Sequence, residues 1–454
     1  MSHPTRSAVL VACCLAFAGA CERDARGRVE TSSAALDSLP PPELLPYDPP
    51  TANGAIEEAD SAGVRIVRNR GRGAWGAALL PVREELRIDP FDGGSASGPH
   101  TITAVWIGAD GKLYVSLGER GLRVFGADGQ PLHRIAAGRG GADGIASILT
   151  SWVRRDSLFV YDADLRRISL FDTAANHIAS WDDPRRAGGL VVPAAPAPDG
   201  WIAEIRLPMT RPDVPAGEPF ERPPRRLHRF EPGADTVGPA LFQVPRPVRY
   251  GAPASEAGIE PALFEAQPYW SFDAAGRLFI TSARDYRIDI YDSAGRPAVR
   301  IARVYTPAAI GPDAIAHARR LVDMHFDTAS GVEPRLRRSW LEAIDRGARL
   351  PLPAHMPPLG RLHVAADGAF WVERLDAIPP ARYQLEWLLG SSADRPSRWD
   401  LFDAAGHFLG TTDLPRGFAP LRLLGTRVAG VLRAGGSADR LLVLGVVPPA
   451  DTAR

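Results

Sequence analysis

Carboxylates and arginines occur close together at five places in this sequence, each time just after a short apolar stretch. Such a pair offers hydrogen-bond acceptors beside fixed donors, so a ring of pairs would suit a small anionic or zwitterionic ligand or a peptide. The same pairs can instead neutralise one another between neighbouring structural elements. The five places hold Glu119 and Arg120; Asp162, Asp164 and Arg166; Glu204 and Arg206; Arg284, Asp285 and Tyr286; and Glu373, Arg374 and Asp376.

Catalysis by these groups is a second interpretation. A hydrolase or lyase could use the carboxylates and arginines directly, with any metal ion held by Asp162, Asp164 or Glu373. No Gly-x-Ser-x-Gly turn or phosphate-binding loop is present. Asparagines that calcium could use, and histidines that zinc could use, lie away from the five places, at Asn53, Asn69, Asn176, His133, His177, His228, His317, His325, His355 and His407. We therefore expect no catalytic set and no cofactor.

The elements that must position these groups are short strands joined by glycine turns. One unit contains the turn Asp110-Gly111, apolar strands at 113–115 and 122–125, and a second turn that ends at Gly129. Recurring units of this kind are typical of β-propeller blades. The residue that ends the third strand of each copy falls at Phe125, Phe171, Phe230, Tyr291, Phe402 and Leu444. Six copies predict an all-β chain with six blades, whose loops after the second strands carry the charged places.

The last copy contains only three strands, so another part of the chain must supply the fourth. Two stretches ahead of the first blade, 64–68 and 85–89, have strand-like patterns. Either could pair with the last copy and close the ring, which would also cover a free sheet edge. Because every blade is needed for closure, we expect residues 63–448 to form one domain.

Residues 305–352 break the strand pattern. Thr306-Pro307 is a good helix start, and apolar residues then recur at helical spacing on both sides of Gly331. We predict two helices inserted between the fourth and fifth blades. They could cover a blade edge or the outer wall, or they could form a lid over one mouth of the ring.

The N-terminal residues have the features of an export signal. Residues 1–21 contain Arg6, an apolar run too short to span a bilayer, and Ala18-Gly19-Ala20-Cys21. This segment resembles a bacterial lipoprotein signal peptide, which implies acylation of Cys21 and a membrane as partner. Cys13 and Cys14 would leave with the signal. Residues 22–62 are rich in proline, serine and alanine and predict an extended tether. We expect a lipid-anchored location in the cell envelope, and Glu22 favours the outer membrane.

Charge argues against nucleic acid as a partner. The formal net charge is zero, and the basic residues are almost all arginines, with Lys112 the single lysine. These arginines are spread through turns and strand ends without the one-sided clustering that a nucleic-acid groove needs. We expect a monomer whose partner is a small ligand or an envelope protein.

Several stretches resemble one family. Residues 60–67, 111–129, 362–372 and 399–406 look like the bacterial six-bladed β-propeller lipoproteins, relatives of the NHL-repeat proteins. The resemblance implies the fold and the helical insert, whereas the family's activities range from binding platforms to amidating lyases. The sequence departs from the lyases because it lacks histidines at the axial loops. Residues 138–144 also replace the usual glycine-rich stretch between the first two blades.

The sequence therefore predicts a membrane-tethered, extracytoplasmic propeller that binds a ligand or a protein through one face. The alternative is a hydrolase or lyase with a carboxylate and arginine site at the axial mouth. A purely structural role in the envelope is the third interpretation.

Overall fold

The computed structural model describes most of the chain after residue 54, and its strands follow from the turns read in the sequence. The described residues are 55–76, 79–91, 101–108, 110–136, 144–154, 157–182, 190–197, 200–206, 213–231, 233–234, 238–251, 259–282, 284–328, 334–389, 396–433 and 438–449. Gly129, Gly295 and Gly406 have positive φ angles of 82°, 81° and 86°. Glycine has no Cβ to oppose that conformation, so these residues close the hairpins.

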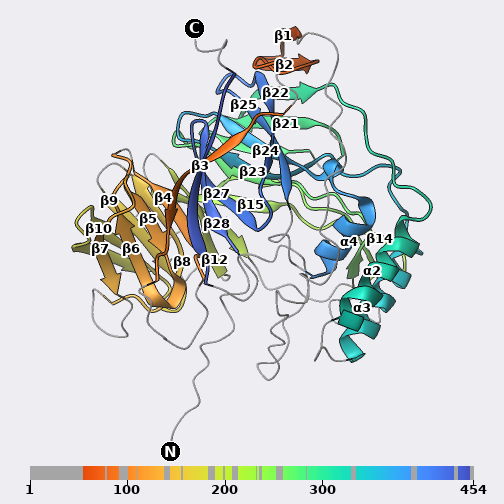
Figure 1. Cartoon of the computed structure of the whole chain (residues 1–454), viewed down its shortest axis with the longest axis horizontal. Coiled ribbons are helices and arrows are strands. Elements are labelled where there is room, and N and C mark those ends of the chain that lie inside the picture. The colour runs from red at the N-terminus through yellow and green to blue at the C-terminus, as the bar shows by residue number, and fades with distance from the viewer. Residues whose placement is uncertain are drawn as a thin grey trace, which may run out of the picture.

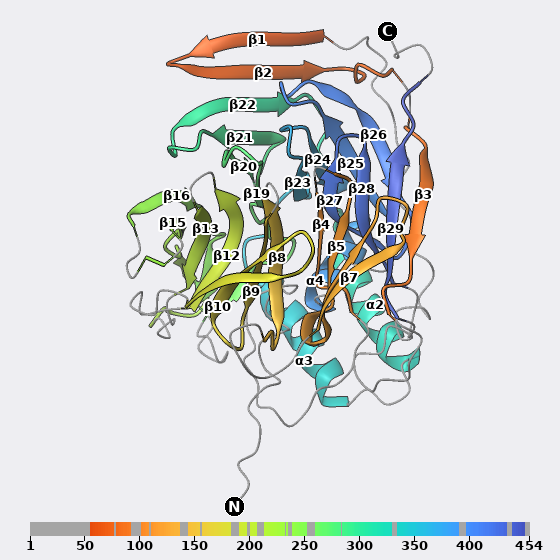
Figure 2. The ribbon, with the colours of Figure 1, turned by 90° about the vertical axis from the view of Figure 1, so that its left-hand side faces the viewer.

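Six sheets form the blades, and the first three blades follow one another along the chain (Figure 2). Blade 1 contains β4 (Ala104–Ile107), β5 (Leu113–Ser116), β6 (Gly121–Phe125) and β7 (Pro131–Ala136). Blade 2 contains β8 (Ile148–Arg154), β9 (Ser157–Asp162), β10 (Arg167–Asp172) and β11 (His177–Asp182). Blade 3 contains β12 (Leu190–Ala197), β13 (Gly200–Arg206), β15 (Arg225–Phe230) and β16 (Ala240–Val244).

The last three blades complete the ring. Blade 4 contains β19 (Trp270–Phe272), β20 (Leu278–Thr281), β21 (Arg287–Tyr291) and β22 (Pro297–Arg303). Blade 5 contains β23 (Leu359–Val364), β24 (Phe370–Arg374), β25 (Ser397–Phe402) and β26 (Phe408–Leu414). Blade 6 contains β27 (Phe418–Leu424), β28 (Arg427–Leu432), β29 (Arg440–Val446) and β3 (Val82–Ile88). First strands lie against first strands of neighbouring blades, so they surround the axis. The six-bladed propeller is confirmed.

An N-terminal strand closes the ring, as the sequence predicts. β3 runs antiparallel to β29, with Ile88 opposite Leu441. Of the two candidate stretches, 85–89 is therefore the one that overlaps the closing strand. The other candidate lies in β2 (Val64–Arg70), which runs parallel to β22 and pairs with β1 (Ala55–Ser61). Blade 4 thus becomes a six-stranded sheet, and its β1 lies within the range assigned to the tether.

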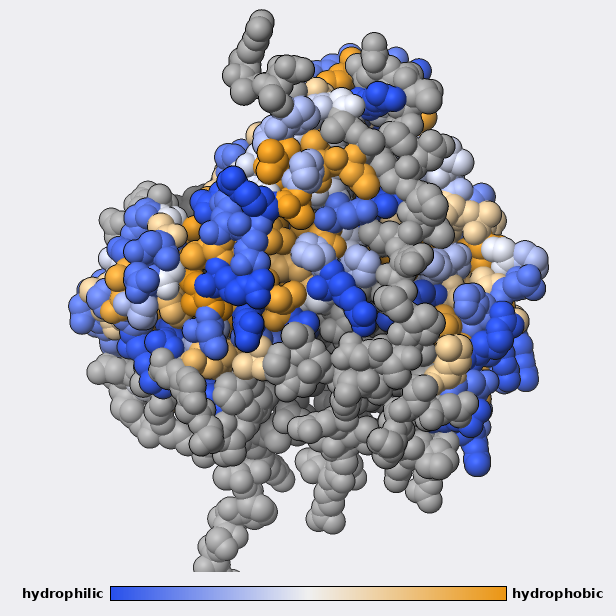
Figure 3. All heavy atoms as spheres, viewed as in Figure 1, coloured by the Kyte–Doolittle hydropathy of each residue, from blue (hydrophilic) through white to orange (hydrophobic). Residues whose placement is uncertain are grey.

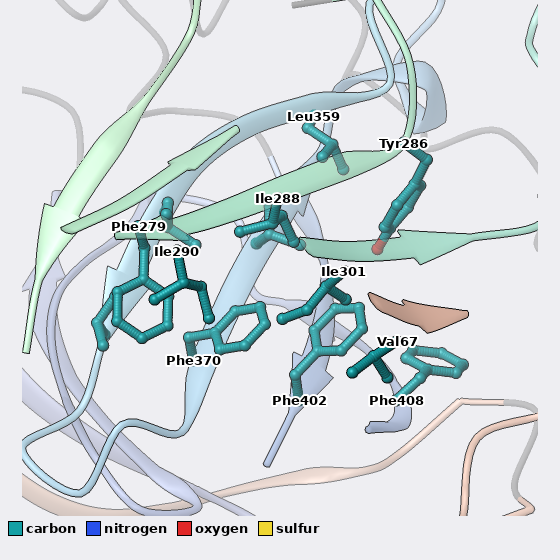
Figure 4. Close-up of a cluster of buried hydrophobic side chains, with 13 residues drawn as sticks. Val67, Phe279, Tyr286, Ile288, Ile290, Ile301, Leu359, Phe370, Phe402 and Phe408 are labelled. Carbon is teal, nitrogen blue, oxygen red and sulfur yellow. The ribbon is translucent and has the colours of Figure 1, made fainter. Parts of the chain in front are cut away.

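Packing explains where β2 lies. Val67 of β2 is fully buried in an apolar cluster with Ile301, Phe402 and Phe408, which belong to blades 4 and 5 (Figure 4). Asn69 donates from Nδ2 to the carbonyl oxygen of Gly406 (3.0 Å) and accepts at Oδ1 from the Phe408 N–H (2.8 Å). These contacts hold β2 against the seam between blades 4 and 5.

The insert contains the two predicted helices, α2 (Ala314–Thr328) and α3 (Pro334–Gly347). Thr306-Pro307 does not start α2, because residues 308 and 310 form backbone hydrogen bonds with residues 356 and 354 instead. A third helix, α4 (Pro380–Leu389), lies between β24 and β25 and was not expected. No helix in the described part of the chain is long and apolar enough to cross a membrane.

The helices lie on one end of the ring rather than on its outer wall. α2 and α3 connect blade 4 to blade 5, and α4 connects the second and third strands of blade 5. Their apolar sides pack with Leu263 and Phe264 from the connection between blades 3 and 4. Hydrophilic residues cover the outward side of α2 and α3, where Arg337 pairs with Asp323 (Figures 1 and 3). We call α2, α3 and α4 the helical cap.

Candidate functional site

All five charged places lie at the end of the ring that carries the helical cap. We call this end the mouth face; it is where second strands turn into third strands and where successive blades join. Glu119, Asp164, Arg284 and Asp285 are exposed there, whereas Asp162, Glu204, Tyr286 and Glu373 are buried and Arg374 is nearly so. Arg120 lies over the ring of Phe91, and Arg166 is half-buried with φ of 52°. β13 ends at Arg206, whose side chain lies outside the described residues.

Two of the buried carboxylates accept hydrogen bonds within their own blade or from the connection that leads into it. Asp162 accepts backbone hydrogen bonds from residues 146, 147, 164 and 165, at 2.5 to 3.4 Å, and so fixes the connection into blade 2. Glu373 accepts two hydrogen bonds from the guanidinium of Arg361 on the neighbouring strand, at 2.8 and 3.1 Å. These oxygens are engaged in the fold. In the described part of the chain no three acidic, histidine or cysteine side chains are grouped as a metal site.

A buried network around Asp400 joins blades 4 and 5. Asp400 is fully buried and accepts hydrogen bonds from Tyr286 (2.5 Å), Thr411 (2.6 Å), Arg303 (2.5 Å) and Arg374 (3.3 Å). Arg374 also forms a bidentate pair with Asp376, at 2.6 and 2.7 Å. Of the predicted residues, Tyr286 therefore bonds across the seam between blades 4 and 5, whereas Arg374 and Asp376 pair with each other within blade 5.

Electrostatics keeps this network charged. Burial alone would raise the pKa of Asp400, but Arg303, Arg374 and the hydrogen bonds hold it below its ordinary value. Burial and the Asp400 charge raise the pKa of Tyr286 well above its ordinary range, so the phenol stays protonated and donates to the carboxylate. The network is a structural joint with every group in a defined role.

A different set of charged residues gathers on the mouth face. We call Glu204, Arg222, Arg246, Arg249 and Glu265 the mouth cluster. Glu204 lies 3.4 Å from Arg246, and Glu265 lies 3.4 Å from Arg249. Burial lowers the pKa of Arg222 to about 10, with further repulsion from Arg246 and Arg249.

Local structure brings these groups together from two blades and the connection between them. Glu204 belongs to β13 of blade 3, and Glu265 precedes β19 of blade 4. Arg249 lies on β17 (Arg249–Gly251), which forms a small sheet with β14 (Pro219–Phe220) and β18 (Ile259–Pro261). Of the mouth cluster, sequence reasoning found only Glu204. The other four lie in long connections without a repeat to mark them.

Glu265 stands out within the mouth cluster. It is 8% exposed, and neither carboxylate oxygen has a hydrogen-bond partner among the described residues. Burial raises the pKa of Glu265 to about 7, although Arg249 and Arg222 oppose that shift. A buried polar group that lacks a hydrogen bond costs about 1–3 kcal/mol, which the ion pair with Arg249 offsets in part.

The helical cap closes over Glu265 through α4. Gln384 is 1% exposed; its Oε1 accepts from the Phe264 N–H (2.7 Å), while its Nε2 has no partner among the described residues. The Tyr383 hydroxyl donates to the carbonyl oxygen of Glu265 (3.0 Å). One buried donor and two buried acceptors on adjoining segments thus lack hydrogen-bond partners among the described residues.

Comparisons with known proteins find similarity only in the backbone fold. No protein-family model and no curated protein matches the sequence. A protein from Bacteroides fragilis that is proposed to be exported has 9% identity and a TM-score of 0.41, over 84% of this chain and 99% of its own. A DUF4221 family member from Bacteroides vulgatus has 10% identity and a TM-score of 0.46, over 81% and 98%. Virginiamycin B lyase from Staphylococcus aureus has 10% identity and a TM-score of 0.37, over 81% and 100%. These similarities carry no argument about activity.

The Asp400 network predicts a large loss of stability in Asp400→Asn. The substitution removes the buried carboxylate that Arg303 and Arg374 share, and breaking such a pair costs about 3–5 kcal/mol. Asp285→Asn is the control, because Asp285 forms an exposed pair with Arg287 that is worth less than about 1 kcal/mol. Denaturant titration of the two variants at pH 7 compares them. Equal losses would show that the network is not a joint.

The same substitution should also change the acid response. Because the pKa of Asp400 is lowered in the folded protein, its stabilisation is present at neutral pH and is lost as pH falls below about 4. Asp400→Asn should therefore lose less stability than the parent protein across that acid range.

The raised pKa of Glu265 predicts the opposite dependence of stability on pH. Its pKa is raised from 4.5 to about 7 by folding, so the folded protein binds the proton more tightly and stability falls as pH rises between those values. Glu265→Gln should remove this slope and gain up to about 3 kcal/mol at pH 8. Glu342→Gln, an exposed carboxylate on α3, is the control and should keep the slope. Thermal and denaturant unfolding from pH 4.5 to 8 measures both, and an unchanged slope in Glu265→Gln would contradict the assignment.

Proposed function

We propose that this protein is a lipid-anchored, extracytoplasmic β-propeller that binds a small ligand at its mouth face. The observation that carries the proposal is the set of unpartnered buried groups of Glu265 and Gln384, beside Arg249 and beneath the helical cap. Each buried group without a hydrogen bond in a native fold needs an explanation, and a bound ligand is one. A gain in stability in Glu265→Gln would support the same view, since binding sites often reduce stability.

The chemistry of the mouth cluster indicates the class of ligand. Arg222 and Arg249 favour an anionic group, because guanidinium forks match carboxylates. Glu265 offers acceptors and therefore requires a donor, such as a hydroxyl or an amine. Gln384 Nε2 requires an acceptor. A small acid that also carries a hydroxyl or amino group, such as a hydroxy acid or an amino acid, meets all three requirements.

Entry of such a ligand requires movement of α4. The hydrogen bonds Tyr383 to Glu265 and Gln384 to Phe264 join α4 to the connection that carries the site, so they must loosen before a ligand reaches the Glu265 carboxylate. These contacts are few beside the strand ladders of the blades. The helical cap is therefore proposed as the part that opens.

A hydrolase or lyase is the second candidate, and one observation favours it. The pKa of about 7 would let Glu265 take up or release a proton at neutral pH, as a general base or acid must. Arg249 and Arg222 would then stabilise negative charge on the substrate. The two candidates share the site and differ only in whether the ligand is consumed.

The proposed anchor predicts the behaviour of Cys21→Ser. Cys21 lies outside the described residues, and the proposal rests on the apolar run and the small residues before it. The variant should lose acyl-chain incorporation and move from the membrane to the soluble fraction, because two acyl chains hold a protein on a bilayer effectively permanently. Fatty-acid labelling and fractionation measure this. Cys14→Ser is the matched control and should remain labelled. Labelling that persists in Cys21→Ser would contradict acylation at Cys21.

The proposed ligand class predicts a difference between malate and succinate, which differ by one hydroxyl. Both are added to the chain from residue 22, and the midpoint of thermal unfolding is followed with concentration. A ligand of the native state raises that midpoint by mass action. Malate should raise it at lower concentration than succinate, since only malate donates a hydroxyl to Glu265.

Variants then assign the effect to the site. Arg249→Gln should lose the response to both acids, and Glu265→Gln should respond equally to the two. Arg284→Gln, an exposed arginine of the same face, should behave like the parent protein. Loss of malate in an NMR time course would support the enzyme candidate. No response to any hydroxy acid or amino acid would reject the mouth cluster as a small-ligand site.

A further inference from the structure

The opposite end of the ring holds a second unusual charge. Arg422 lies on β27, the first strand of blade 6, just before the turn into β28. Its guanidinium carbon is 3.6 Å from the centre of the Trp106 ring, on the first strand of blade 1. β27 also lies against β4 and β23, so Arg422 is beside the axis, at the end remote from the helical cap. We propose that Arg422 and Trp106 form an axial site for the oxyanion group, carboxylate or phosphate, of a small molecule.

A β-bulge directs Arg422 toward Trp106. The register of β27 against β28 shifts just before Arg422, which then stands opposite Ala429, while Leu423 stands opposite Val428. Ala429 packs between blades 6 and 1, whereas Leu423 and Val428 pack between blades 5 and 6. Arg422 therefore faces blade 1. Regular alternation from Phe418 would have turned it toward blade 5, so the extra residue re-aims this one side chain.

A neighbouring pair shows how the fold satisfies a stacked arginine. Arg361 lies 5.6 Å from the ring centre of Trp399, and Glu373 takes its N–H groups in a bidentate pair. Arg422 repeats the stacking on Trp106, yet no carboxylate or other acceptor is bonded to its guanidinium among the described residues. Stacking uses the face of the guanidinium and leaves its in-plane donors available. A ligand oxyanion would accept hydrogen bonds from Arg422 in the way that the Glu373 carboxylate accepts them from Arg361.

The local field favours an anion. Burial lowers the pKa of Arg422 to about 10, so it stays charged at neutral pH. Burial, together with Arg361 and Arg422, lowers the pKa of His363 to about 3, so this imidazole is neutral; its buried Nε2 has no partner among the described residues. Neither Arg422 nor His363 belongs to the mouth cluster. The axial site is therefore independent of the proposed function.

Inorganic phosphate and acetate are the probes, added to the chain from residue 22 at pH 7, with chloride keeping ionic strength constant. We expect a saturable rise in the unfolding midpoint with at least one of the two oxyanions. Phosphate also stabilises proteins by exclusion from their surfaces, but that effect does not saturate and is the same in all variants. A response confined to phosphate would indicate a phosphoryl ligand, and one confined to acetate a carboxylate ligand.

Arg422→Gln should bind the responding oxyanion roughly tenfold or more weakly, as expected for the loss of a charge-assisted hydrogen bond. Arg440→Gln, an exposed arginine of the same blade, should keep the parent response. If Arg422→Gln does not fold, the parent protein decides the question: the oxyanion should protect Arg422 from an arginine-specific reagent, as read by mass spectrometry. Absence of a saturable response, or equal binding by Arg422→Gln, would overturn the axial site.

Discussion

The pairing of β3 with β29 is the constraint on which the rest of the structure depends. Each blade buries apolar side chains against both neighbours, so six blades are stable only when the last also meets the first. Residues from both ends of the chain share that final seam: Ile88 and Leu441 lie in one apolar cluster with Phe125 of blade 1. A single antiparallel ladder thus converts a row of sheets into a ring with a fixed axis. The contact of Arg422 in blade 6 with Trp106 in blade 1 can form only after that closure.

Inside the closed ring, several buried charges are matched by partners within a blade or across a seam between blades. Asp400 gathers donors from blades 4 and 5, and Asp162 fixes a connection, so each carboxylate is matched by several hydrogen bonds. Replacing such matched groups leaves uncompensated charge, which is why they are costly to break. Glu265 and Arg422 are different because the described structure leaves their bonding incomplete. The contrast between matched and unmatched charges separates the groups that serve the fold from those proposed to serve binding.

The sequence predicted the propeller because its signals are local. Each glycine turn and each aromatic strand end, such as Phe125 or Phe402, lies within a few residues of the pattern that defines it. Helix α4 was missed because Pro380 and the short apolar run after it resemble the loops around them. Of the mouth cluster only Glu204 was found, since Arg249 and Glu265 meet through long connections whose paths no local rule determines. Arg422 was missed because a bulge decides which side it faces, and no residue pattern identifies that bulge.

The route by which the chain enters the ring bears on how both proposed sites are presented. β1 and β2 form the outer edge of the blade 4 sheet, so the segment that follows Cys21 joins the ring at its rim (Figure 2). A chain that entered through the mouth face would have to pass the helical cap, and one that entered at the axis would occupy the position of Trp106. Attachment at the rim does neither. The mouth cluster and the axial arginine lie at opposite ends of the ring, so small ligands could approach them from opposite directions.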